Sequence, residues 1–179
     1  MQKLVLGLTL SRIISGPILF FAIALNYFGL AFFIFISASI TDYLDGHLAR
    51  KHDVTSALGE VLDPVADKII VIFIIFAIAI HLESLYVSLV GSIILSRDIW
   101  VGSLRDLNAR IGNIAATKVS WFAKLKTAFQ LITFSAYIFA LYLNNELFIF
   151  TCHFFLFATM IASLSSAFDY TVSTFIKKK

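Results

Sequence analysis

The most informative part of the chain runs from Asp42 to Asp67 and reads DYLDGHLARKHDVTSALGEVLDPVAD. Four of its aspartates fall at helical spacing: Asp42 and Asp45 at its start, Asp63 and Asp67 at its end. Residues three or four apart on a helix share a face, so each pair is predicted to lie on one face of its own helix. The connection between these helices is short, which favours antiparallel neighbours and converging carboxylates. Converging carboxylates repel one another unless a cation lies between them, and hard oxygen ligands suit Mg²⁺, Mn²⁺ or Ca²⁺.

The rest of the chain is strongly apolar. Of its 179 residues, 60% are hydrophobic and only 14% are charged, and the mean hydropathy is +0.93. A soluble domain of this size carries far more charge, so the composition predicts a membrane protein in contact with the lipid bilayer. The net charge of +3 is too small to indicate a nucleic-acid partner. The single cysteine, Cys152, excludes an intrachain disulfide framework.

Apolar segments recur at a spacing that predicts an all-α fold, an integral membrane bundle of six transmembrane helices forming one domain over residues 1–179. The predicted helices cover residues 4–26, 28–50, 58–81, 85–110, 118–143 and 147–175. The apolar stretch from Tyr27 to Thr41 has 15 residues, which rise only ~22 Å against a hydrocarbon core of ~30 Å. The stretch from Ile69 to Ile80 is shorter still. Both helices must therefore continue into the aspartate motif, which places the aspartates near the inner membrane surface.

The basic residues predict the orientation. With the N-terminus inside, the inner helix ends collect all fourteen Lys and Arg residues. The three outer turns, near Asn26, at His81–Glu83 and at Asn144–Glu146, contain none. Basic residues concentrate on the cytoplasmic side of membrane proteins. Both termini and the aspartate motif are therefore predicted to lie on the cytoplasmic side of the inner (cytoplasmic) cell membrane.

A carboxylate site with two metal ions suits displacement at phosphorus, because the ions stabilise both the entering and the leaving oxygen. Gly46 and Gly59 would let a ligand or a facing backbone approach closely, although tight helix packing explains them equally well. Arg50, one turn beyond Gly46, can bind a phosphate or pair with a carboxylate. A hollow open to cytoplasm and bilayer favours a substrate with a lipid part and a charged head group. The residues alone thus predict metal-dependent phosphoryl chemistry on a lipid.

The same stretch carries a resemblance to a known family. The pattern D-x2-D-G-x2-A-R-x8-G-x3-D-x3-D is met at every fixed position, by Asp42, Asp45, Gly46, Ala49, Arg50, Gly59, Asp63 and Asp67. This resembles the CDP-alcohol phosphatidyltransferase family, whose six-helix membrane enzymes move a phosphatidyl group from CDP-diacylglycerol to an alcohol and release CMP.

The resemblance implies a role for each motif residue. All four aspartates, Asp42, Asp45, Asp63 and Asp67, are expected to hold two divalent ions, Mg²⁺ or Mn²⁺. Asp67 is also expected to be catalytic, as the base that takes the proton of the acceptor hydroxyl. The residues expected to bind CDP-diacylglycerol are Asp42, Gly46, Arg50, Ser56 and Gly59. The resemblance further implies a homodimer.

The acceptor is predicted from the second half of the chain. Arg97-Asp98-Ile-Trp-Val-Gly-Ser-Leu-Arg105 resembles the R-E-x-x-x-x-G-L-R segment of bacterial phosphatidylglycerophosphate synthases, and the segment containing Lys124 and Lys126 resembles their G-K-x-K-T segment. The resemblance implies that the two arginines and two lysines, Arg97, Arg105, Lys124 and Lys126, bind the phosphate of glycerol 3-phosphate. Each one has the alternative role of anchoring a helix end. The sequence departs from the pattern at Asp98, where Glu is usual.

Two alternatives remain open. Ser96-Arg97-Asp98 and Ser56-Ala-Leu-Gly59 also resemble the cardiolipin synthases of this family, whose acceptor is phosphatidylglycerol; Arg105 and Lys126 favour glycerol 3-phosphate. An interpretation from another class is a divalent-cation transporter. A transport path requires polar residues through both leaflets, and the predicted outer half of this chain has almost none.

Overall fold

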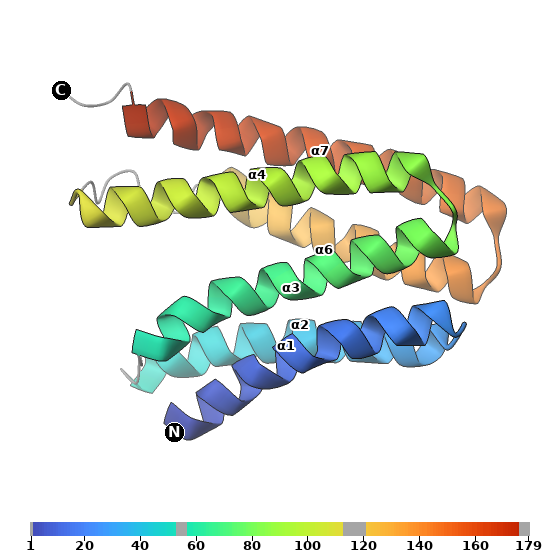
Figure 1. Ribbon diagram of the computed structural model, residues 1–179, viewed down its shortest axis with the longest axis horizontal. Coiled ribbons are helices and arrows are strands. Elements are labelled where there is room, and N and C mark those ends of the chain that lie inside the picture. Colours follow the sequence, from blue (N-terminus) through green and yellow to red (C-terminus); the bar gives the residue numbers. More distant parts are fainter. Residues whose placement is uncertain (1, 53–56, 113–120, 176–179) are drawn as a thin grey trace.

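The structure is a computed structural model that describes residues 2–52, 57–112 and 121–175, with side chains described over 6–41, 62–112 and 126–175. Every regular element within these ranges is a helix (Figure 1). The helices are α1 Gln2–Ala24, α2 Phe28–His52, α3 Ala57–His81, α4 Leu85–Arg110, α6 Trp121–Tyr142 and α7 Glu146–Phe175. The predicted all-α class is confirmed, and the predicted helices correspond one to one with these six.

The helices run up and down and form two groups. Figure 1 shows α1, α2 and α3 in the lower half of the view and α4, α6 and α7 in the upper half, with both chain ends at the same end of the bundle. Within the groups, α1 packs against α2 and α3, and α7 packs against α4 and α6. The groups meet where α3 contacts α4 and where α2 contacts α6. The candidate site lies at this seam, where residues of both groups line one cavity.

The three turns at the opposite end of the bundle share one geometry. Asn26, Glu83 and Asn144 each have a positive φ, between 47° and 64°. In each turn the backbone N–H of this residue donates to the carbonyl three residues back, and the next N–H donates to the carbonyl five residues back from itself. This is the Schellman motif, in which a left-handed residue satisfies the last carbonyls of a helix. The turns coincide with the three predicted outer turns, which lack Lys and Arg.

Helices α2 and α3 continue through the aspartate motif, as the length argument predicted. Each has 25 residues, a rise of ~37 Å that exceeds a hydrocarbon core of ~30 Å. Asp42, Asp45, Gly46 and Arg50 lie on α2, and Gly59, Asp63 and Asp67 lie on α3. The motif is therefore helical on both sides of its connection.

The outer surface of the bundle suits a lipid environment. Within the described side-chain ranges, four helices are long and apolar enough to cross a membrane, over Leu6–Ala24, Leu62–His81, Leu85–Arg110 and Glu146–Phe175. A shorter apolar stretch, Phe28–Thr41, lies on α2. Large apolar side chains such as Phe33, Phe150 and Phe168 are exposed, which in water would be an aggregation hazard and in a bilayer is expected. The chain is a multi-pass membrane protein.

Close contact between α1 and α3 depends on Gly16. A Cβ atom at Gly16 would lie 2.9 Å from Cδ2 of Phe73 and 3.2 Å from Cγ2 of Ile69, closer than packed side chains tolerate. Gly7, on the same helix, has nothing within 4 Å of such an atom. We expect Gly16→Val to lower the free energy of unfolding by about 1–3 kcal/mol through overpacking. Gly7→Val is the matched control, and thermal unfolding in detergent is the measurement. Equal melting of both variants would contradict the packing role.

Candidate active site

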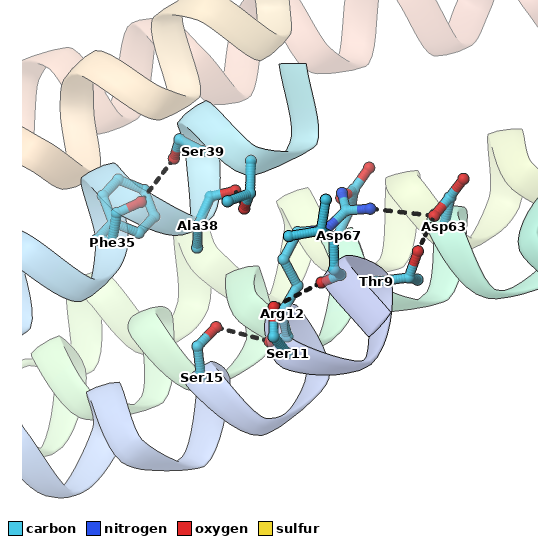
Figure 2. Close-up of polar contacts among 11 residues, drawn as sticks. Thr9, Ser11, Arg12, Ser15, Phe35, Ala38, Ser39, Asp63 and Asp67 are labelled. Atoms are coloured by element: carbon cyan, nitrogen blue, oxygen red, sulfur yellow. Dashed lines mark hydrogen bonds and ion pairs between the residues drawn. The ribbon is translucent and has the colours of Figure 1, made fainter. Parts of the chain in front are cut away.

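Two of the motif aspartates are bound by residues of α1. The buried guanidinium of Arg12 donates from Nη2 to Oδ1 of Asp63 at 3.0 Å and from Nη1 to Oδ1 of Asp67 at 2.9 Å. The hydroxyl of Thr9 donates to Oδ1 of Asp63 at 2.6 Å. Figure 2 shows Arg12 and Thr9 reaching from α1 to the two carboxylates on α3. A single buried cation thus bridges both carboxylates.

Helical spacing explains this arrangement. Asp63 and Asp67 are four residues apart on α3, and Thr9 and Arg12 are three apart on α1, so each pair occupies one face of its helix. The close packing of α1 on α3 brings these faces together. Arg12 has a side chain that is only 1% exposed, whereas the side chains of Asp63 and Asp67 are 40% and 52% exposed. The carboxylates therefore keep an accessible surface while Arg12 fixes them from behind.

The remaining predicted site residues of α2 and α3 are placed by their helices alone. The side chains of Asp42, Asp45 and Arg50 lie outside the described ones, as do Ser56 and the surroundings of Gly46 and Gly59. Among the described residues, no three His, Cys, Asp or Glu side chains gather as a metal site. Since two of the four aspartates are outside that set, the convergence of all four stays a prediction. The described pair fits a divalent ion in chemistry, because both carboxylates are hard oxygen donors with exposed surface.

A cavity of about 430 Å³ lies beside the pair, at the seam between the two helix groups. Asp67 is one of its lining residues, and α2, α4 and α6 supply further walls. Its basic lining residues are Arg12, Lys68, Arg97, Arg105 and Lys126, and its acidic ones are Asp67 and Asp98. Among the described lining residues, five cations against two carboxylates leave an excess of positive charge, which suits a phosphate. Three of the four residues predicted for the acceptor phosphate thus surround one cavity; the side chain of the fourth, Lys124, lies outside the described ones.

The four predicted acceptor residues differ in their surroundings. Arg97 is buried and bound on three sides: Nε donates to the carbonyl of Ser163 at 2.7 Å, Nη2 donates to the hydroxyl of Ser166, and Nη1 pairs with Asp98 at 2.9 Å. The ammonium of Lys126 also pairs with Asp98. Arg105 is exposed at the cavity. Arg97 therefore joins α4 to α7 as well as lining the cavity, a role that the sequence did not indicate.

Removing Asp98 is expected to destabilise the protein. Its carboxylate is the counter-charge that Arg97 and Lys126 share, and all three side chains are at most 14% exposed. Breaking a buried ion pair by removing one partner costs about 3–5 kcal/mol, because the remaining charge is left uncompensated. We expect Asp98→Ala to lose stability of this order in thermal or denaturant unfolding. Asp106→Ala, an exposed site on the same helix, is the control, and an equally stable Asp98→Ala protein would disprove the shared role.

Sequence reasoning missed three residues of the site. Arg12 and Lys68 were counted only among the fourteen basic residues that orient the chain, and Thr9 was not predicted to belong to the site. A charged residue inside an apolar membrane helix is expensive and functional by default, so Arg12 carried a usable signal. Lys68 carried no sequence signal of a functional role beyond its place next to Asp67. Its ammonium occupies the space beside Gly102, where a Cβ atom would lie 2.6 Å from Nζ.

The chain is similar along most of its length to one class of membrane enzyme. The chain belongs to the CDP-alcohol phosphatidyltransferase family, whose model matches residues 6–168. Among its relatives is the CDP-diacylglycerol–glycerol-3-phosphate 3-phosphatidyltransferase of Wigglesworthia glossinidia brevipalpis, 39% identical over 128 residues that cover 70% of each chain. The protein of the same name from Haemophilus influenzae is 37% identical over 128 residues, 70% of this chain and 69% of the relative. That from Sodalis glossinidius is 35% identical over 126 residues, 64% of this chain and 69% of the relative.

Proposed function

We propose that this protein transfers the phosphatidyl group of CDP-diacylglycerol to glycerol 3-phosphate, giving phosphatidylglycerol phosphate and CMP. The observation that carries the proposal is the shared cavity, onto which both Asp67 and the basic residues of α3, α4 and α6 open. The names of the relatives support the same substrates. Membership of a transferase family also favours an enzyme over the divalent-cation transporter.

Different residues are proposed to bind the donor, CDP-diacylglycerol, and the acceptor, glycerol 3-phosphate. Asp42, Asp45, Asp63 and Asp67 would hold two divalent ions, Mg²⁺ or Mn²⁺, which when bound neutralise the diphosphate and favour departure of CMP. Gly46, Arg50, Ser56 and Gly59 would accommodate the cytidine diphosphate part. This donor side rests on the family resemblance and on the oxygen-donor chemistry of the aspartates.

On the acceptor side, the phosphate of glycerol 3-phosphate would bind among Lys68, Arg105, Lys124 and Lys126, with Arg97 behind them. Asp67 would accept the proton of the acceptor hydroxyl as that oxygen attacks the lipid-side phosphorus. Its position on the cavity wall supports this role, because a base must reach the proton it removes. Arg12 would hold the carboxylate in place during the transfer.

We further propose that all six helices cross the inner cell membrane, with both chain ends and the site on the cytoplasmic side. The placement of all fourteen Lys and Arg residues in the sequence supports this orientation, and the lack of Lys and Arg in the three capped turns agrees with it. The proposal includes a single domain over residues 1–179 and a homodimer, the latter by family resemblance alone.

Acceptor choice is the experiment that tests the proposed function. Purified protein in detergent with CDP-diacylglycerol and Mg²⁺ or Mn²⁺ is given glycerol 3-phosphate, phosphatidylglycerol, inositol phosphate or serine separately, and CMP release is followed. We expect release with glycerol 3-phosphate alone and none after chelation of the metal. Release with phosphatidylglycerol instead would identify a cardiolipin synthase. No release with any acceptor would overturn the enzyme function.

A further inference from the structure

Gln130 on α6 is a buried polar residue with an unused donor. Its side chain is 5% exposed, and its amide nitrogen Nε2 has no hydrogen-bond partner among the residues that the structure describes. Leaving a buried donor unsatisfied costs about 1–3 kcal/mol. Thr133, the next buried polar residue on α6, differs: its hydroxyl donates to the carbonyl of Phe129 at 2.8 Å and lies 3.1 Å from the hydroxyl of Thr159. Gln130 thus retains the free-energy cost of an unsatisfied buried donor, which Thr133 avoids.

The residue that carries this unused donor borders the acceptor cavity. Gln130 is among the residues that line it, whereas Thr133 is not. Lys126, Gln130 and Phe134 follow one another at four-residue spacing, so they form one face of α6, and all three line the cavity. Gln130 therefore lies one turn beyond Lys126, between the basic wall and the apolar floor that Phe134 and Phe35 provide.

The order of these groups matches the order of groups in a small polyol phosphate. The ammonium and guanidinium groups suit the dianionic phosphate, because charge-assisted hydrogen bonds are the strong ones. A neutral amide one turn further suits a neutral hydroxyl. We propose that the side-chain amide of Gln130 forms a hydrogen bond with the acceptor hydroxyl that does not react, and that this bond selects acceptors with a hydroxyl on the carbon next to the phosphate-bearing one. The inference rests on the proposed function and deepens it.

The test combines a change in the protein with a change in the acceptor. Gln130→Met keeps the length and burial of the side chain and removes the donor. The acceptor 3-hydroxypropyl phosphate keeps the phosphate and the reacting hydroxyl of glycerol 3-phosphate and lacks the middle hydroxyl. We expect the wild-type protein to prefer glycerol 3-phosphate by about tenfold in kcat/KM, as one hydrogen bond allows. In Gln130→Met the two acceptors should be used almost equally, with the KM for CDP-diacylglycerol unchanged.

Thr133→Val is the matched control, since it removes a buried hydroxyl from the same helix away from the cavity; it should keep the tenfold preference. A wild-type protein that shows no preference, or a Gln130→Met protein that keeps it, would overturn the inference while leaving the proposed function intact. A wild-type protein that releases no CMP with glycerol 3-phosphate would overturn both. Thermal unfolding is used to check that Gln130→Met folds. We expect it to fold, because an apolar side chain replaces an unsatisfied buried amide.

Discussion

Replacing Asp67 with Asn should reduce the rate of CMP release about 10³-fold. General-base catalysis contributes about 10²–10⁴-fold, and an amide of the same shape accepts no proton at neutral pH. Of the described carboxylates, Asp63 and Asp67 face Arg12, and the substitution removes the charge of the second, so the ion pair at 2.9 Å is weakened. Initial rates with saturating glycerol 3-phosphate and CDP-diacylglycerol are the measurement, and the loss should appear in kcat.

Asp169→Asn is the control for this change. Asp169 is an exposed carboxylate on α7 and is not among the residues that line the acceptor cavity. It should retain the wild-type rate. If Asp67→Asn kept a tenth or more of the wild-type rate while remaining folded, Asp67 would not be the base, and its place on the cavity wall would need another explanation.

Replacing Arg12 with Met should reduce the rate of CMP release about 100-fold, while the binding of CDP-diacylglycerol changes little. Arg12 contacts Asp63 and Asp67 through two different nitrogens, and displacing a reacting group by about 1 Å costs on the order of 10²-fold. Arg12→Lys should recover only part of the rate, because an ammonium lacks the fork geometry that spans two carboxylates. The rates of both variants are compared under the same metal concentrations.

Ser11→Ala provides the comparison for Arg12. Ser11 is exposed and adjacent in sequence, and within the described part of the chain its hydroxyl donates to the carbonyl of Leu8. Its loss should leave the rate unchanged. Full activity of Arg12→Met would mean that Arg12 balances charge without positioning the carboxylates, and equal activity of the Lys and Met variants would exclude the fork geometry as its contribution.

The helices were largely predictable from the sequence, and the exceptions have local causes. Long apolar runs with charges at their ends determine where helices lie in a membrane protein. The first helix was predicted to reach residue 26 and ends at Ala24, because Asn26 adopts a left-handed conformation that apolar periodicity does not reveal. The second was predicted to end at residue 50 and continues to His52, since its polar last turn carries no apolar signal.

From spacing alone, the candidate site was predictable only where its residues follow one another on a helix; the family resemblance added Arg97, Arg105 and Lys126, which line one cavity. Spacing identified Asp63 and Asp67 as neighbours, because a helix makes the fourth residue face the first. Spacing does not show which other helix packs against that face, so the contacts from Thr9 and Arg12 were not predicted. The same limit applies to Asp98, whose partners include Lys126 on another helix, and to Gln130, which stands out only once the cavity is known.

The seam between the two helix groups has a consequence for how such a protein can change during evolution. The four aspartates lie on α2 and α3, whereas most of the residues assigned to the acceptor lie on α4 and α6. Substitutions on α4 or α6 can therefore alter which alcohol is accepted while the carboxylates and their supporting helix α1 remain as they are. On the proposed roles, a bundle of this kind can acquire new head-group products while the reacting step stays the same, because most of the residues proposed to select the acceptor lie on other helices than the carboxylates.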